Sequence, residues 1–245
     1  LLGPAFSGRV RGELDLGGVP ARPQVRADLQ ASNLRLPGAL AVASLSLQGE
    51  SGIADDSPFR IRLDGRTLTL GDKQLARLSL QADGSRLAHR LQLSADGRLQ
   101  QHEQQLALQL AGGFERGSSN WRGTLQQLEA TGWLPLRLQQ PVALRAAAAN
   151  VALAASRWQA LGAQWQLGES SWQRGGGWRS DGRVQGLALS ALAPWFTPPL
   201  RQTLVFDAGW QLNGAQGWPQ GSVQLQRTQG DVWLPAPAGE QALGL

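Results

Sequence analysis

Alternation of apolar and polar residues is the feature that most constrains the fold of this 245-residue chain. Every second position is apolar in runs such as Phe59–Leu63, Leu106–Leu110 and Leu204–Leu212. Successive residues of a β-strand point to opposite faces of the sheet, so this period of two gives one apolar face and one polar face. Strands of a parallel sheet covered on both sides would instead be continuous apolar runs. The sequence therefore predicts an all-β, mostly antiparallel fold with one apolar face.

Turn residues separate these runs at short intervals and predict roughly 16–20 strands. Asp-Gly between two alternating runs is a strong hairpin signal, and on this basis we expect turns at the pairs 64–65, 83–84, 96–97 and 181–182. The apolar phase slips by one near Asn33, which predicts a β-bulge. The alanine-rich stretch 146–155 keeps the alternation and is predicted as strand. One short helical connector is expected near residues 190–196.

The composition excludes several kinds of chemistry. The chain has no Cys, Met or Tyr and only two histidines, His89 and His102. It therefore has no disulfide, no thiolate metal site and no cysteine nucleophile. Neither histidine has a second ligand at metal-binding spacing, and Asp55-Asp56 precedes Ser-Pro, which is typical of a turn. Phosphate-binding loops, nucleophile elbows and dinucleotide fingerprints are missing from the sequence. We expect no enzyme activity, no metal and no cofactor.

The charge is positive but dispersed. There are 23 basic and 18 acidic residues, a formal net charge of +5. Nucleic-acid binders gather their basic residues and interleave them with aromatic residues, whereas the arginines here occur singly among acidic residues. We therefore expect no nucleic-acid partner. No stretch approaches the ~18 apolar residues of a membrane span. Because the sequence lacks a methionine, we expect it to be an internal fragment of a longer polypeptide.

Several segments resemble the TamB family, which is related to AsmA-like proteins and other repeating β-groove, bridge-like lipid transfer proteins. They include Leu106–Gly112, the W-x-G-x-L motif of Trp121–Leu125, and Gly132–Leu136 followed by Gln140-Pro141-Val142. The resemblance implies that residues 1–245 form a single elongated β-taco, a folded sheet whose apolar face lines a groove. It also implies a periplasmic protein with its inner-membrane anchor outside this segment.

The function implied by this resemblance is a hydrophobic conduit that carries phospholipid between the inner and outer membranes. Each CH₂ group left in water costs about 0.8 kcal/mol, so acyl chains need a continuous apolar track. We expect a set of leucines and valines on the apolar face to line it: Leu91, Leu93, Leu106, Leu108, Leu110, Leu136, Leu138, Val142, Leu144, Val151 and Leu153. The competing interpretation is a β-sandwich or barrel core in which these side chains pack against one another and leave no groove.

Four tryptophans, Trp158, Trp165, Trp172 and Trp178, are spaced by six or seven residues. Intervening glycines exclude a long helix, so we expect one tryptophan on each of four short strands, filling the core or rim. The alternative role of these tryptophans is contact with lipid at the mouth of a groove.

The resemblance also implies an alternative function, which is assembly of outer-membrane proteins and autotransporters with a barrel protein of the TamA type. We expect such a function to act through strand addition at a sheet edge. The same edges would allow edge-to-edge self-association of the chain.

Overall fold

The computed structural model describes residues 7–20, 22–36, 40–71, 73–99, 102–193, 195, 200–214, 219–236 and 239–244. Strands account for 77% of it and helix for 2%, and the strands pair antiparallel. This confirms the predicted all-β, antiparallel class. Twenty strands are present in the described residues, at the upper end of the predicted number. The chain divides into two units, Leu1–Leu134 and Pro135–Leu245.

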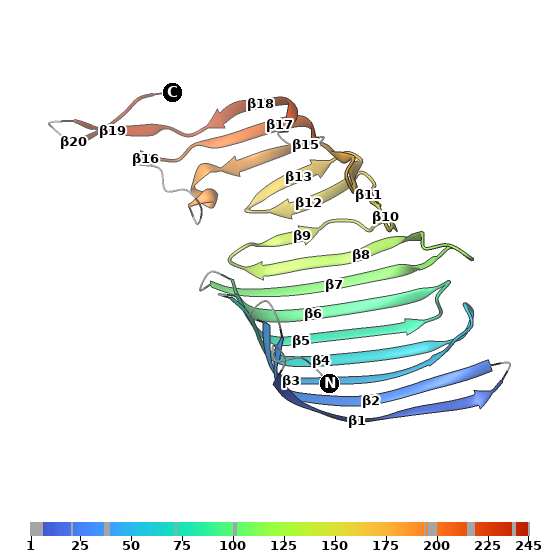
Figure 1. Ribbon diagram of the computed structural model, residues 1–245. Coiled ribbons are helices and arrows are strands. Elements are labelled where there is room, and N and C mark those ends of the chain that lie inside the picture. Colours follow the sequence, from blue (N-terminus) through green and yellow to red (C-terminus); the bar gives the residue numbers. More distant parts are fainter. Residues whose placement is uncertain are drawn as a thin grey trace. The chain divides into compact units, whose positions relative to one another are not determined.

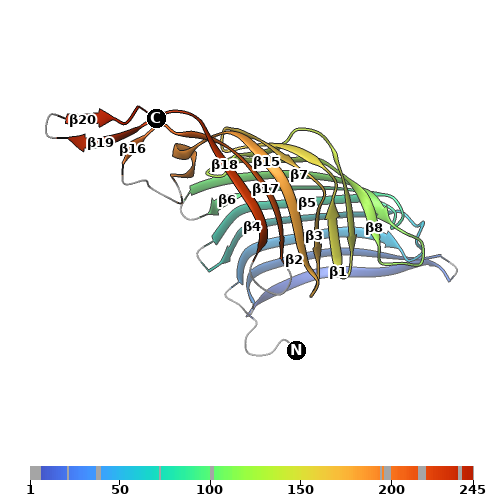
Figure 2. The same cartoon turned by 90° about the horizontal axis from the view of Figure 1, so that it is seen from above.

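Unit 1 is an antiparallel meander in which each strand pairs with the next one along the chain (Figure 1). Figure 2 shows the same succession from above. The loops between strands are short, which is why chain neighbours become sheet neighbours. Its strands are β1 (Ser7–Val19), β2 (Arg22–Leu36), β3 (Leu40–Gly52), β4 (Phe59–Leu70), β5 (Lys73–Gly84), β6 (His89–Leu99), β7 (His102–Phe114) and β8 (Trp121–Gly132).

A crease crosses the first five strands of unit 1. Asn33 has a φ of 53° and lies at a shift in the β1–β2 register, which confirms the predicted bulge. The neighbouring pairings place Ala43, Thr67 and Ala76 beside it in β3, β4 and β5, and Thr67 also has a left-handed φ, of 50°. The register shifts again at this line between β5 and β6. The second bend residue, Thr67, was not predicted.

Unit 2 contains shorter strands. One series of antiparallel pairs runs β9–β12–β13–β15–β17–β18. A second series, β10–β11–β14, pairs with the first residues of β15. The bounds are β9 (Leu136–Leu138), β10 (Val142–Ala147), β11 (Asn150–Leu153), β12 (Ser156–Ala160), β13 (Ala163–Leu167), β14 (Ser170–Gln173), β15 (Gly177–Ala188), β17 (Val205–Gly214) and β18 (Gln220–Gln229).

The remaining elements of unit 2 are a small sheet and one helical turn. The sheet has the order β16 (Arg201–Gln202), β19 (Val232–Ala236) and β20 (Gly239–Ala242). The 3₁₀ turn η1 (Leu189–Leu192) confirms a short helical connector in this region; the expected range 190–196 also covers positions 194 and 196, which lie outside the described residues. The alanine-rich stretch forms the hairpin of β10 and β11, so its prediction as strand was correct.

Three of the predicted Asp-Gly turns are wrong. The pairs at 64–65, 96–97 and 181–182 lie inside β4, β6 and β15. In each case the glycine falls on the apolar face at a crowded place. A Cβ on Gly182, for example, would come within 2.7 Å of the Trp210 ring. These glycines relieve packing against a neighbour, and the Asp-Gly pair at 83–84 alone ends its strand.

Candidate functional site

The apolar face of unit 1 carries rows of side chains that cross the strands. Strand alternation places every second residue on this face, and the observed register aligns those residues from strand to strand. The central row is leucine on seven successive strands, β2 to β8. Its members are Leu29, Leu47, Leu63, Leu80, Leu93, Leu108 and Leu128.

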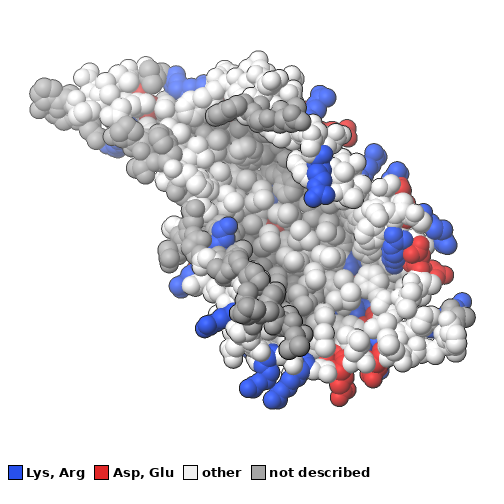
Figure 3. All heavy atoms as spheres, in the orientation of Figure 1, with Lys and Arg blue, Asp and Glu red and all other residues white. Residues whose placement is uncertain are grey.

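Apolar rows flank the leucine row on both sides. One row contains Ile61, Leu91, Leu110 and Leu125, with alanine or glycine on the other strands. The other contains Leu45, Leu78 and Leu106, again interrupted by small residues. Figure 3 shows this face in unit 1, where the middle is occupied by uncharged residues and the charged side chains lie mainly along the margins. Three adjacent rows therefore make one broad apolar surface.

The leucines of the central row are half-buried, neither enclosed nor fully exposed. Among the described apolar side chains of unit 1, those below one-tenth exposure are Val42, beside the crease, and Leu125, at 5% and 6%. A sandwich core would enclose most of its inward leucines between two sheets. The side chains of this face lie beside their row neighbours and keep part of their surface accessible.

The residues predicted to line a groove separate into two groups. Leu91, Leu93, Leu106, Leu108 and Leu110 all lie in the three rows of unit 1, on β6 and β7. The other members of the leucine row were not predicted, although Leu29, Leu47, Leu63 and Leu80 lie in alternating runs. At Leu128 the alternation slips by one residue, because the β7–β8 register shifts between Gln109 and Leu110. The missing information was the register, which decides which leucines become neighbours.

The other predicted residues share one face of the unit 2 strands. Cross-strand pairs connect them through Trp158, Trp165, Trp172 and Trp178 to the same side of β15. Their exposure differs widely, from 3% for Val142 and 8% for Leu138 to 39% for Val151. The six are Leu136, Leu138, Val142, Leu144, Val151 and Leu153.

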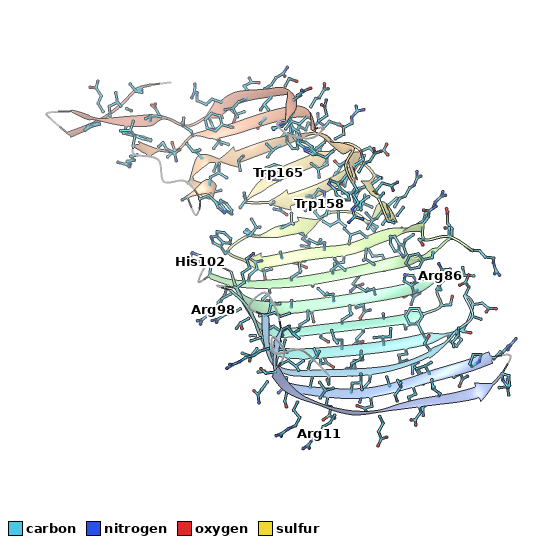
Figure 4. The ribbon with its side chains drawn as sticks, in the orientation of Figure 1. Arg11, Arg86, Arg98, His102, Trp158 and Trp165 are labelled. Carbon is cyan, nitrogen blue, oxygen red and sulfur yellow. The ribbon has the colours of Figure 1, made fainter. Side chains whose placement is uncertain are left out.

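The four tryptophans occupy β12, β13, β14 and β15, one per strand as predicted. Their exposure ranges from 8% for Trp158 to 49% for Trp172. The indole N–H groups of Trp158 and Trp165 donate to Ser156 Oγ at 2.9 Å and to the Ala160 carbonyl at 3.0 Å. Figure 4 labels these two side chains on their neighbouring strands. Because the two indole N–H groups are hydrogen-bonded to nearby residues, the rest of each ring contributes apolar surface to this face of unit 2.

His89 belongs to an aromatic cluster at one end of the apolar face of unit 1. Its ring centroid lies 5.9 Å from those of Phe59 and Phe114 and 6.2 Å from that of Trp121. Trp121 Nε1 donates to His89 Nε2 at 2.9 Å, and His89 Nδ1 lies 3.0 Å from the Ser85 carbonyl. One ring nitrogen therefore accepts and the other donates, which is the pattern of a neutral imidazole. Both nitrogens are occupied by structural hydrogen bonds.

Arg86 connects the loops around this cluster. Its guanidinium lies 5.2 Å from the Phe114 ring centroid, pairs with Asp55 at 2.9 Å and donates to the Ser118 carbonyl at 2.6 Å. Three loops, those after β3, β5 and β7, meet at this side chain, which Figure 4 labels. The second histidine, His102, stacks on Trp133 with the rings 5.6 Å apart. The contacts of Arg86 and the His102–Trp133 stack were not predicted, because they join residues about thirty positions apart.

The opposite face of unit 1 is polar and carries ion pairs. Arg62 Nε lies 2.8 Å from Asp64 Oδ2, and Ser79 donates to Asp64 Oδ1 at 2.9 Å. The hydrogen bond from Arg62, followed by the one from Ser79, lowers the pKa of Asp64 below its ordinary value of 3.8. In the part of the chain that the structure describes, no three His, Asp or Glu side chains gather as a metal site would require. No helix there has the length and apolar character of a membrane span.

Comparison with known families gives one match that covers most of the chain. The TamB N-terminal domain family matches residues 1–235. No solved structure matches the chain. TamB proteins are components of the cell envelope with roles in transport and assembly. The match confirms the resemblance seen in the alternating runs and in the W-x-G-x-L motif, and the chain belongs to the TamB family.

Proposed function

We propose that the apolar face is a hydrophobic track along which phospholipid acyl chains move between the inner and outer membranes, in the periplasm. The observation that carries this proposal is the half-exposed leucine row on seven successive strands. At about 4.8 Å per strand, this row extends roughly 29 Å. One leaflet of a bilayer is about 15 Å of hydrocarbon, so the row is longer than one acyl chain.

The chemistry of the three rows favours movement over tight binding. The leucine row and its two neighbours contain aliphatic side chains, alanine and glycine, with no charged group among the paired positions. An acyl chain therefore gains about the same hydrophobic free energy at each strand, about 0.8 kcal/mol for each CH₂ covered. A uniform surface of this kind holds no position in preference to the next.

Photo-crosslinking in the full-length protein in cells tests this proposal. A photoreactive amino acid at Leu108 should yield phospholipid adducts by mass spectrometry. The same amino acid at Gln109, on the opposite face of β7, should not yield them. Equal recovery from the two positions, or recovery from neither, would contradict a lipid track on this face.

Assembly of outer-membrane proteins with a TamA-type barrel is the second candidate, and the exposure of β1 supports it. β1 is the terminal strand of the unit 1 series, and all thirteen of its residues are exposed. A long exposed strand is a template for strand addition by a partner. Proline at Leu14 should reduce assembly while leaving lipid adducts at Leu108 unchanged, since proline removes a backbone donor and leaves the leucine row intact.

A further inference from the structure

A cavity of about 780 Å³ opens on the polar face of unit 1, and Ala31, Leu45, Gly65 and Leu78 contribute to its lining besides the polar residues. Its floor follows one cross-strand row of short side chains, which includes Ser46, Ser79 and Ser94 on β3, β5 and β6. Longer side chains of the adjacent rows border this floor. Because the floor row crosses the strands, the cavity is a trough that runs from β1 to β6. We call it the arginine trough.

The positive charge of the arginine trough is concentrated at two places. Arg9 and Arg11 lie at its β1 end. Arg62, Arg66 and Arg77 lie on β4 and β5, with Asp64 and Asp96 among them. Gln30, Ser32, Ser44 and Ser46, on β2 and β3, are uncharged and lie between the two groups.

Internal ion pairs account for only part of this charge. Arg62 pairs with Asp64 at 2.8 Å and Arg77 with Asp96 at 3.3 Å. Within the described residues, Arg9, Arg11 and Arg66 have no ion-pair partner, so three positive charges are in excess. One of these arginines faces a like charge, because Arg66 lies directly opposite Arg77 in the β4–β5 register. Like charges directly opposite in a sheet are destabilising.

We propose that the arginine trough binds a saccharide that carries two phosphate groups, one held by Arg9 and Arg11 and the other by Arg66. The guanidinium fork matches the oxygens of a phosphate. Two phosphate monoesters carry about −1.5 to −2 each near neutral pH, which offsets three excess positive charges.

The uncharged residues in the middle of the arginine trough are the reason for proposing a saccharide between the two phosphates. Serine hydroxyls and the Gln30 amide both donate and accept hydrogen bonds, as sugar hydroxyls require. Three strand spacings separate β1 from β4, roughly 14 Å between backbones, and the arginine side chains reach in from both ends. An acidic peptide is less suited to this site, since a peptide pairs along a strand edge and the trough crosses the strands on their face.

Isothermal titration of the 245-residue chain at fixed ionic strength tests the site with glucose 1,6-bisphosphate, glucose 6-phosphate and maltose. The bisphosphate should bind at least about tenfold more tightly than the monophosphate, and maltose should give no measurable heat. Arg11→Gln and Arg66→Gln should each weaken bisphosphate binding about tenfold or more. Arg90→Gln removes an exposed charge from the same polar face outside the trough and should leave binding unchanged.

Thermal unfolding separates loss of the site from loss of the fold. Without ligand, Arg66→Gln should unfold close to the wild-type temperature, because removing the Arg66–Arg77 repulsion offsets the lost attraction between Arg66 and Asp64. With glucose 1,6-bisphosphate, wild type should gain stability that Arg66→Gln does not gain. The proposal is overturned by an equal loss of binding in Arg90→Gln, by equally tight binding of poly-glutamate, or by no binding of the bisphosphate.

A sedimentation assay identifies the source of the phosphate. Phosphatidylcholine vesicles that contain a bisphosphorylated disaccharide lipid should carry the protein down if the ligand is a lipid headgroup. If the ligand is a soluble sugar phosphate, glucose 1,6-bisphosphate binds in solution and the protein stays in the supernatant. Both results support the arginine trough as the phosphate site, provided that Arg66→Gln loses the interaction and Arg90→Gln keeps it.

Discussion

At the scale of single residues, the sharpest contrast lies between Leu93 and Gln92, neighbours on opposite faces of β6. Leu93→Asp places a carboxylate in the middle of the leucine row and should abolish lipid transfer between donor and acceptor vesicles. Its cost in folding free energy should be about 1–3 kcal/mol, because Leu93 is half-buried. Gln92→Asp adds the same charge to the polar face and should retain both transfer and stability. Equal transfer by the two variants would count against a track on this face.

The carboxyl group of Asp64 gives a pH-dependent prediction. Hydrogen bonds from Arg62 and then Ser79 lower the pKa of Asp64 below 3.8 in the folded protein. A lowered pKa means that the charged form stabilises the fold at pH values above 3.8, and that this contribution is lost as the pH falls through the folded value. Asp64→Asn should therefore reduce the free energy of unfolding near neutral pH. Denaturant titrations should show the gap from wild type closing in strong acid, and a gap independent of pH would contradict this.

At the scale of elements, glycine and tryptophan form packing pairs between strands β15 and β17. These pairs explain why the Asp-Gly at 181–182 lies inside a strand, although its sequence predicts a turn. Gly182 lies opposite Trp210, and the indole occupies the space of a Cβ. Trp178 lies in the same way over Gly214. Local turn propensity favours Asp-Gly wherever it occurs. The Trp210 ring that packs against Gly182 comes from a strand almost thirty residues away. Only the register between β15 and β17 therefore shows why a glycine is needed at this position.

The pair Gly182 and Gly209 offers a matched test of this packing. A Cβ on Gly182 would approach Gln166 O to 2.6 Å and the Trp210 ring to 2.7 Å, so Gly182→Ala should cost about 1–3 kcal/mol of stability. Gly209 is a strand position on the opposite face, with its nearest atom at 3.8 Å. Gly209→Ala should be neutral or stabilise by about 0.4–1 kcal/mol. Chemical denaturation of both variants checks this, and similar losses would disprove a packing role specific to Gly182.

At the scale of the whole molecule, the alternation of apolar and polar residues predicted the all-β class and which residues share the apolar face. The strand register determined which of those residues become neighbours in a row. Leu91 and Leu93 could be assigned to the apolar side because their own strand alternates. That Leu93 continues a row from Leu29 to Leu128 depends on loop lengths and on the crease. Thr67 in the crease left no signal, since threonine is an ordinary strand residue. That residues 1–245 act as a single elongated segment stays a prediction.

We expect strand β1 to mediate self-association of the chain. Val10, Leu14 and Leu16 extend its apolar side and are 57%, 63% and 78% exposed. A long exposed strand with apolar side chains pairs readily with another chain. We expect sedimentation velocity to show concentration-dependent self-association of the 245-residue chain.

Two substitutions on β1 show whether this association uses the apolar side of the strand. Leu14→Lys and Leu16→Lys together should return the chain to a monomer, because charges that point to the apolar side of an edge strand block pairing by desolvation and repulsion. Glu13→Lys makes the same change in net charge, +2, on the polar side of the same strand and should leave self-association in place. If Glu13→Lys dissociates the chain as completely, the contact is a general effect of charge, and the apolar edge of β1 is not its cause.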